Sequence, residues 1–260
     1  MVVANDMIDV VDVINVSKAF GSHVVLKDVS FKVEENENFI VFGQSGSGKS
    51  VLLKCMVGLL LPDSGEIFIK GTNILNLSQK ELNKVRKNIG FLFQGAALYD
   101  SMSVRENLEF PLIRNFTFTP KEREEKIKTV LENVSLEEAI DKMPSELSGG
   151  MKKRIGLARS IITEPKLMLY DEPTTGLDPI TSKEISLLIL ELQKSLKMTS
   201  IVVTHDLLCA EIIADRAIVL NEGIVQYEGT IPELTSSRDP FLRNFFSHEI
   251  IEDQNRRINV

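Results

Sequence analysis

The chain has 260 residues, of which 43% are hydrophobic and 26% are charged, and its formal net charge is −7. This length and composition predict one large domain, or one domain with an additional lobe, with ample apolar material for a buried core. The acidic balance argues against nucleic acid as a partner, because a broad nucleic-acid surface needs a basic excess to neutralise phosphates.

The N-terminal part of the chain reads as β-strands that lead into a glycine-rich loop. Alternating and β-branched apolar residues fill residues 9–42, and the last run, FIVF, is followed by GQSGSGKS at residues 43–50. An apolar helix is expected next, over residues 51–61, before a Pro-Asp-Ser-Gly turn.

Two further strands are expected at residues 66–70 and 89–94, with a short helix between them. Ser78 and Glu81 have the spacing of a capping box, in which the serine and glutamate side chains bond to each other's backbone amide. This pair predicts where the short helix begins.

Residues 95–164 read as predominantly helical, and they form a helical insertion in a sheet-based core. TPKE, at residues 119–122, combines a capping box with proline at the first helical position. Ser135 and Glu138 are expected to open another short helix. After the insertion, buried parallel strands are predicted at residues 167–170, 200–203 and 217–220.

The two cysteines, Cys55 and Cys209, lack any C-x-x-C or metal-ligand spacing, and buried small side chains are expected there. The N-terminus has no signal-peptide pattern. The longest apolar run is interrupted by Lys54 and is shorter than the roughly 20 residues of a membrane span. The chain is therefore expected not to cross a membrane by itself.

GQSGSGKS fits the phosphate-loop pattern G-x-x-x-x-G-K-[ST] and lies between a predicted strand and a predicted helix. Backbone amides of the loop and the helix N-terminus suit phosphate groups. Lys49 supplies a positive charge to the β- and γ-phosphates, and the Ser50 hydroxyl suits Mg²⁺. The predicted nucleotide-binding residues in this segment are Gly43, Ser45, Gly46, Ser47, Gly48, Lys49, Ser50 and Val51.

An acidic pair follows the apolar strand LMLY. Asp171 lies at the strand's carboxyl end, where ligands bind in open α/β sheets, and it is a candidate Mg²⁺ ligand. An aspartate alone fits a kinase or a slow switch. Glu172 can polarise an attacking water, and the pair therefore favours hydrolysis.

A second glycine-rich helix start occurs in LSGGMKKRIGLARS, where Ser148 reads as an N-cap. It can present its hydroxyl and the amides of Gly149 and Gly150 to an anion, although an ordinary capped helix is the alternative. One face of this helix is predicted to be apolar, formed by Met151, Ile155, Ala158 and Ile162.

In this order, the segments resemble the nucleotide-binding subunit of ABC transporters over roughly residues 9–235. The matching elements are a Walker A loop (43–50), a Q-loop glutamine (Gln94), a signature (147–151), Walker B (167–172), a D-loop with Asp178 and a switch histidine (His205). The signature departs from the family at Met151, where glutamine is usual.

The resemblance implies ATP and Mg²⁺ as cofactors, and an α/β P-loop NTPase core of ABC type with an antiparallel β subdomain and a helical subdomain. It implies that Gln94 senses Mg²⁺ and the attacking water, and that His205 contacts the γ-phosphate. Phe20 stands where the family often has an aromatic residue stacked on adenine. A strand-packing role for Phe20 is the alternative.

The resemblance also implies partners and a location. Two copies would dimerise head to tail, with Ser148, Gly149 and Gly150 of one copy completing the other's site. The dimer would drive separate ABC permease subunits at the cytoplasmic face of a bacterial inner membrane. The expected ATPase domain spans residues 8–240, with a helical subdomain at about 95–164.

The cargo is suggested by FLFQGAALYDSMSVRENLEFPL, at residues 91–112, which is similar to ATPases of Mla-type phospholipid transporters. That subgroup works with Mce-domain proteins, and a small regulatory subunit is a further suggested partner. An importer ATPase for amino acids or other small solutes is the alternative.

The C-terminal segment, residues 241–260, is expected to be a helical extension. Asp239-Pro240, just before it, has the pattern of a helix start. Its apolar stripe either packs on the chain's own domain or contacts the second copy, and the Mla resemblance favours contact. The stripe consists of Phe241, Phe245, Phe246 and Ile250.

Three rival classes fit less well. A DNA-repair or chromosome ATPase of related structure would insert long coiled coils between Walker A and the signature, and heptads are not sustained there. A translation-factor ATPase would usually carry two tandem sets of these motifs. A non-hydrolysing nucleotide-binding regulator conflicts with the intact set Lys49, Asp171, Glu172 and His205.

Overall fold

A computed structural model describes residues 9–247, and it contains two β-sheets. The strands of the smaller sheet are β1 (Asp9–Phe20), β2 (His23–Glu34), β4 (Ser64–Ile69) and β5 (Thr72–Asn73). Its order is β2-β1-β4-β5, and every neighbouring pair is antiparallel. This sheet is the predicted antiparallel β subdomain.

The larger sheet is six-stranded, in the order β10-β9-β3-β8-β7-β6. Its strands are β3 (Asn38–Phe42), β6 (Ile89–Leu92), β7 (Leu167–Asp171), β8 (Thr199–Thr204), β9 (Arg216–Asn221) and β10 (Ile224–Gly229). All neighbouring pairs are parallel except β9 and β10. Every residue of β3, β7 and β8 is buried, as their continuous apolar runs predict for strands covered on both faces.

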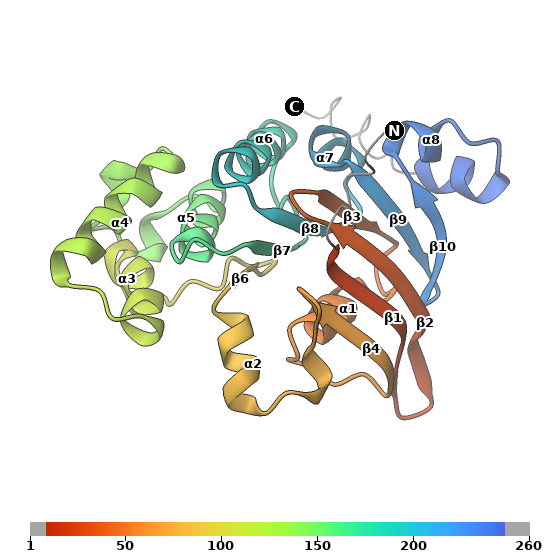
Figure 1. Ribbon diagram of the computed structural model, residues 1–260. Helices are drawn as coiled ribbons and strands as arrows, with labels where there is room; N and C mark the ends of the chain where they lie inside the picture. Colours follow the sequence, from red (N-terminus) through yellow and green to blue (C-terminus); the bar gives the residue numbers. More distant parts are fainter. Residues whose placement is uncertain (1–8, 248–260) are drawn as a thin grey trace, which may run out of the picture.

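Helices cover the larger sheet and form one end of the molecule. They are α1 (Lys49–Met56), α2 (Gln79–Arg86), α3 (Val104–Asn115), α4 (Pro120–Asn133), α5 (Gly149–Ile161), α6 (Pro179–Leu196), α7 (Leu207–Ile213) and α8 (Ile231–Thr235). Figure 1 shows α3 and α4 at the left end of the molecule, away from the antiparallel sheet. Short 3₁₀ turns occupy Ile74–Asn76, Glu137–Ala139 and Pro144–Glu146. The predicted fold class is confirmed.

The central strand β3 separates two apolar cores. Ile40 and Phe42 pack into the core that contains α5, α6 and α7. Phe39 and Val41 pack into the core that contains α1 and the antiparallel sheet. Because both faces of β3 are fixed, the loop that follows it starts from a rigid position.

Helix α1 is shorter than predicted, because it ends at Met56 rather than at residue 61. Gly58 has a φ of +65°, its N–H donates to the Cys55 carbonyl, and the Leu59 N–H donates to the Lys54 carbonyl. This pair of hydrogen bonds is a Schellman motif, for which glycine is the usual residue. The apolar character of the run hid this stop signal.

Ser135 does not open a helix, so that prediction is wrong. Its φ of +55° places it just past the end of α4, where its N–H donates to the Glu132 carbonyl. The following 3₁₀ turn has Leu136 at its N-cap position. The capping boxes predicted at Ser78 and Thr119 are both present.

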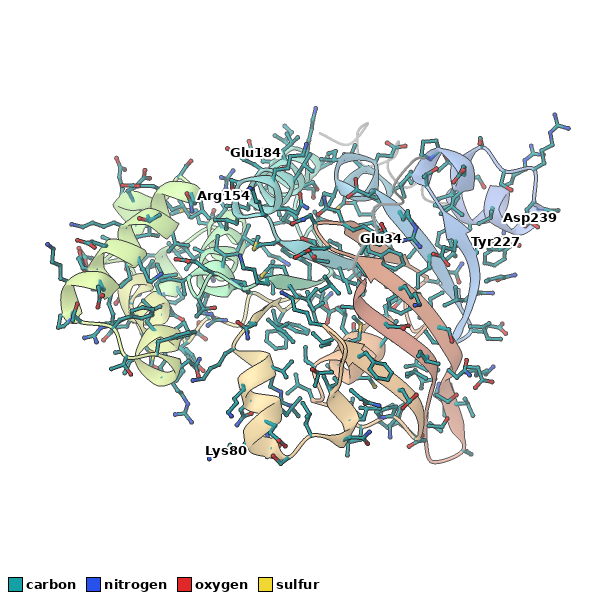
Figure 2. The ribbon with its side chains drawn as sticks, viewed as in Figure 1. Glu34, Lys80, Arg154, Glu184, Tyr227 and Asp239 are labelled. Carbon is teal, nitrogen blue, oxygen red and sulfur yellow. The ribbon has the colours of Figure 1, made fainter. Side chains whose placement is uncertain are left out.

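Helices α5 and α6 lie side by side, as Arg154 and Glu184 in Figure 2 illustrate. The Arg154 guanidinium is 3.0 Å from the Glu184 carboxylate. Both cysteines are buried, as predicted. No helix in the described part of the chain combines the length and the apolar character that a membrane span requires.

Residues 240–247 are helical and pack on the chain's own domain. The rings of Phe245 and Phe246 make edge contacts with Phe42, with ring centroids 6.3 Å and 5.5 Å away. These two side chains therefore pack on the chain's own domain, which is the less favoured of the two predicted alternatives, and contact of the stripe with a second copy stays a prediction. Ile250 lies outside the described residues.

Candidate nucleotide-binding and hydrolytic site

The loop between β3 and α1 requires glycine at its two ends. Gly48 has a φ of +102°, and a Cβ there would lie 2.8 Å from Leu26 Cδ2 and 2.9 Å from the Val25 carbonyl oxygen. A Cβ on Gly43 would lie 2.6 Å from the Leu220 carbonyl oxygen. These close approaches fix the loop against β2 and β9, and they aim its amides at the space in front of α1.

Lys49 is buried, with 6% of its surface exposed, and it is held inside the loop. Its Nζ donates to the carbonyl oxygens of Gly43 (2.6 Å) and Gln44 (3.1 Å). It also forms an ion pair with Glu172, at 3.5 Å from Oε1. The loop lysine and the Walker B glutamate are thus direct neighbours.

Ser50 and Asp171 meet across the site, although 121 positions separate them in the chain. The Ser50 hydroxyl donates to Asp171 Oδ1 at 2.8 Å. The contact arises because β3 and β7 both flank β8, so their carboxyl ends meet at one edge of the sheet. A hydroxyl and a carboxylate together are oxygen ligands of the kind that Mg²⁺ prefers.

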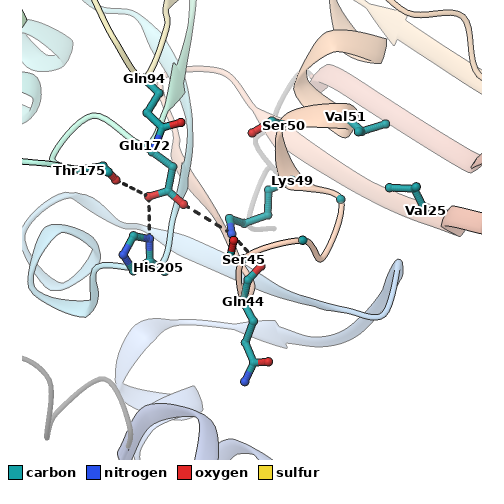
Figure 3. A pocket seen from close by; sticks show the side chains of 12 residues that line it. Val25, Gln44, Ser45, Lys49, Ser50, Val51, Gln94, Glu172, Thr175 and His205 are labelled. Atoms are coloured by element: carbon teal, nitrogen blue, oxygen red, sulfur yellow. Dashed lines mark hydrogen bonds and ion pairs between the residues drawn. The ribbon is translucent and has the colours of Figure 1, made fainter. Parts of the chain in front are cut away.

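Glu172 is the centre of the polar cluster shown in Figure 3. Its Oε2 lies 2.8 Å from His205 Nδ1 and accepts a hydrogen bond from the Thr175 hydroxyl at 3.1 Å. Burial raises the pKa of this carboxyl. The hydrogen bond and charge of His205, the charge of Lys49 and the Thr175 hydroxyl outweigh burial and hold the pKa below its ordinary value.

A cavity of about 770 Å³ opens in front of these groups. It is lined by Val25, Gln44, Ser45, Gly46, Gly48, Lys49, Ser50, Val51, Gln94, Glu172, Thr175 and His205. The structure therefore brings together the four predicted catalytic residues and most of the predicted phosphate-loop residues. Figure 3 shows the Gln94 side chain next to Glu172.

Some predicted residues lie outside the cavity wall. Gly43 and Ser47 lie within the loop, and Asp171, at the end of β7, accepts the hydrogen bond from Ser50 without lining the cavity. Phe20 is at the end of β1 with 49% of its surface exposed and with Lys18 Nζ 5.6 Å from its ring centroid. Its stacking on adenine stays a prediction.

Sequence reasoning missed three of the lining residues. Val25 belongs to β2, and only the tertiary packing of β2 brings it to the cavity, so no local sequence pattern marks it. Gln44 lies inside the recognised loop, and Thr175 follows Glu172 by three positions, so proximity to a motif is the only signal for either.

The signature lies at the start of α5 and does not line this cavity. Ser148 is exposed and caps the helix, accepting a hydrogen bond from the Met151 N–H at 3.3 Å. Gly150 approaches α6, since a Cβ there would lie 2.8 Å from Thr181 Cγ2. Asp178 caps α6 and accepts hydrogen bonds from two backbone amides, each at 3.0 Å.

The residues of the cavity fit ATP and Mg²⁺. Beside the cavity, within the phosphate loop, the Ser47 hydroxyl is buried without a hydrogen-bond partner, and backbone amides of such a loop suit an anion. Among the described residues, no group of three or more histidine, cysteine, aspartate or glutamate side chains is arranged to hold a metal. A site of one hydroxyl and one carboxylate suits Mg²⁺ that is bound together with phosphates.

Comparison with known proteins agrees with this site. Residues 26–175 match the family model described as ABC transporter. The chain is 40% identical to the intermembrane phospholipid transport system ATP-binding protein MlaF of Haemophilus influenzae, over 93% of this chain and 91% of that protein. It is also 40% identical to the methionine import ATP-binding protein MetN of Carboxydothermus hydrogenoformans, over 80% of this chain and 61% of that protein.

A solved dimeric ATP-binding cassette in a post-hydrolysis state, bound to ADP and Pi, superposes with a TM-score of 0.78. Its sequence is 34% identical, and the match covers 85% of this chain and 98% of that chain. The chain belongs to the ABC transporter family, and it is an ATP-binding subunit that hydrolyses ATP with Mg²⁺.

Proposed function

We propose that two copies of this chain form a head-to-tail dimer around ATP and drive a separate membrane permease. The observation that carries the proposal is the separation of the two phosphate sites. The signature residues Ser148, Gly149 and Gly150 stand at an exposed helix start and do not line the chain's own cavity. A second copy supplies the missing contact, as the dimeric arrangement of the structural neighbour suggests.

In this proposal, each residue of the cavity has a distinct task. Lys49 and the loop amides bind the phosphates, and Ser50 and Asp171 hold Mg²⁺, which neutralises phosphate charge when bound. Glu172 orients the attacking water and accepts its proton as the water oxygen bonds to the γ-phosphorus. The bond between that phosphorus and the oxygen of ADP then breaks, leaving ADP and phosphate.

His205 and Gln94 organise the attack. His205 is already joined to the Glu172 carboxylate, so it fixes the orientation of that carboxylate relative to the phosphates. The Gln94 side chain reaches the cavity from the loop after β6, which connects to the helical end of the molecule. We propose that Gln94 contacts Mg²⁺ and so links the presence of the bound nucleotide to the position of the helical end of the molecule.

The permease contact is proposed at a groove of about 430 Å³ between β6, the loop after it and α3. Its aromatic residues all come from segment 91–112, and Phe93 and Tyr99 are 37% and 45% exposed. Tyr99 packs between Phe110, with ring centroids 5.1 Å apart, and the guanidinium of Arg159 at 5.7 Å. Exposed aromatics beside a cation suit a helix of a partner protein.

We propose phospholipid as the cargo, transported between inner and outer membranes. The likeness to MlaF over nearly the whole of both chains supports it, as does segment 91–112. An Mce-domain protein and a small regulatory subunit are the accompanying partners. The 40% identity to MetN, over a smaller share of both chains, supports the second candidate, an importer of amino acids or other small solutes.

The proposed location is the cytoplasmic face of a bacterial inner membrane, where the chain is peripheral and held by its permease. Residues 8–240 form the proposed ATPase domain, and residues 95–164 form its helical subdomain, which contains α3 and α4. Residues 241–260 are the proposed C-terminal extension.

The decisive experiment is affinity isolation of the full chain from native membranes, followed by mass spectrometry of proteins and lipids. Permease subunits, an Mce-domain protein and bound phospholipid are the expected result. A solute-binding protein without any Mce-domain protein would reject the phospholipid cargo. A Phe93→Ala, Tyr99→Ala variant should lose the permease, whereas Ile224→Ala, at an exposed site on β10, should retain it.

The dimer and the role of Glu172 are tested together by Glu172→Gln. The variant should bind ATP, lose hydrolysis and accumulate as a dimer in size-exclusion chromatography with ATP and Mg²⁺. Normal turnover in this variant would reject the role given to Glu172. A hydrolysing chain that stays monomeric under all ATP conditions would reject the shared site.

A further inference from the structure

Lys153 is a buried lysine on α5 whose ammonium group reaches the back of the nucleotide cavity. Only 6% of its surface is exposed. Its Nζ donates to the backbone carbonyl of Gln94, and to the backbone carbonyl of Glu172 at 3.3 Å. Burying a cation is costly unless polar groups compensate it, so these two contacts define its place. Both acceptors belong to residues that line the cavity.

The peptide that Lys153 contacts at Glu172 has an unfavourable backbone conformation. Glu172 has a φ of +51°, in the left-handed region that non-glycine residues rarely adopt. Its N–H donates to the Val203 carbonyl at 2.9 Å, on the side of β8. Lys153 holds the carbonyl of the same residue from the side of α5. Such a conformation persists only where the surroundings enforce it, and these contacts do so.

The same helix, α5, also hydrogen-bonds to the Q-loop after Gln94. Ala96 and Ala97 both have positive φ, +59° and +50°, and their carbonyl oxygens accept hydrogen bonds from the Arg159 guanidinium at 3.0 Å and 2.9 Å. Gly156 provides the close contact, because a Cβ there would lie 2.8 Å from Ala96 Cβ. Lys153, Gly156 and Arg159 follow one another at intervals of three, so they share one side of α5.

We propose that Lys153 is a positioning residue for ATP hydrolysis. From the signature helix, it holds the backbones of Gln94 and Glu172 at a fixed separation and so sets where their side chains meet the water and Mg²⁺. Because Ser148 caps the start of α5, the helix end that faces the partner's nucleotide and the lysine behind the chain's own site move as one body. The inference rests on the roles proposed above for Gln94 and Glu172.

The test is Lys153→Met in the purified full-length chain, with ATP hydrolysis measured over a range of ATP concentrations. Methionine keeps most of the length of the side chain and removes the charge and the donors. We expect kcat to fall by about 10- to 100-fold, as misplacement of a reacting group by about 1 Å does. We expect KM for ATP to change by less than about threefold, because Lys153 is not among the residues that line the cavity.

Lys153→Arg should restore at least about a third of the wild-type kcat, because arginine keeps a buried cation that can donate to both carbonyls. Lys183→Met, at an exposed position on α6, is the matched control and should turn over normally. If Lys153→Met does not fold, Lys153→Leu, which also lacks the charge and the donors, takes its place with the same expected values. Normal kcat in the neutral variant, a change confined to KM, or no rescue by arginine would overturn the inference.

The outcome is separable from that of the proposed function. If Glu172→Gln abolishes hydrolysis while Lys153→Met is normal, only the positioning role fails. If Glu172→Gln itself hydrolyses ATP normally, the role of Glu172 fails and with it the basis of the inference. ATP-dependent dimer formation by a Glu172→Gln, Lys153→Met double variant would show that binding survives without the lysine, as we expect.

Discussion

Replacing Gly156 by alanine adds one methyl group at the tightest contact between α5 and the Q-loop. The new Cβ would lie 2.8 Å from Ala96 Cβ and 3.1 Å from Leu92 Cδ1. Since carbon atoms pack at about 3.5–4.0 Å, the loop or the helix must move by about 1 Å. Such overpacking costs about 1–3 kcal/mol, whereas alanine in a helix is favoured over glycine by about 1 kcal/mol. We expect the free energy of unfolding to fall by about 1 kcal/mol.

The effect on hydrolysis should be larger than the effect on stability. Ala96 is two positions from Gln94, so a shift of the loop moves the glutamine relative to the phosphates. We expect kcat to fall about tenfold at a temperature where the variant is fully folded. Urea denaturation followed by circular dichroism gives the stability, and phosphate release gives kcat. Gly95→Ala is the control for stability, since no atom lies within 4 Å of its added Cβ.

A compensating change sharpens this prediction. Ala96→Gly removes the methyl group that Gly156→Ala strikes, and glycine also accepts the φ of +59° at that position. The double variant should therefore recover most of the lost kcat, which a double-mutant cycle would report as coupling between the two sites. A Gly156→Ala variant with normal stability and normal kcat, or a double variant without recovery, would refute the rigid contact.

Three further predictions concern single sites. Burial raises the pKa of Glu172, but its contacts with His205 and with nearby charges lower it below the ordinary value of 4.5. Its carboxylate therefore adds stability above about that pH, and this stability is lost as the pH falls through the folded-state pKa. The Tm difference between wild type and Glu172→Gln should narrow in acid, and a constant difference would contradict this. Ser50→Ala should raise the Mg²⁺ concentration needed for half-maximal hydrolysis about tenfold, because Asp171 loses its hydrogen-bond partner. Ser50→Thr keeps the hydroxyl and should leave that concentration unchanged. Phe246→Ala should lower the free energy of unfolding by about 3–5 kcal/mol in urea denaturation, because this ring is 2% exposed.

The contacts that the sequence predicts best are those between motifs on neighbouring parallel strands. Lys49 and Ser50 follow β3, and Asp171 ends β7, with β8 lying between. Because the carboxyl ends of such strands share one edge, recognising the motifs was enough to bring these residues together. The rule needs only the strand directions, which the connecting helices impose.

Contacts that depend on how separate layers approach each other could not be predicted. Val25 reaches the cavity only because the antiparallel sheet folds over the phosphate loop. Lys153 belongs to the run MKKR, and helical periodicity assigns a lysine to the solvent side of an amphipathic helix. Its burial is possible because two backbone carbonyls, on Gln94 and Glu172, face α5, and no sequence pattern shows where a carbonyl points.

The two lysines that contact Glu172 bind different parts of this residue, and the difference has a consequence for the proposed mechanism. Lys49 pairs with the carboxylate, at 3.5 Å, whereas Lys153 donates to the backbone carbonyl. In the proposed mechanism, the phosphates of ATP carry more negative charge than the carboxylate, and we expect them to displace it from Lys49. The side chain of Glu172 would then be free to turn toward the water, while the hydrogen bond from Lys153 holds the backbone carbonyl of Glu172. In the proposed mechanism, we therefore expect nucleotide binding itself to release Glu172 from Lys49, through a change limited to the side-chain torsions of Glu172.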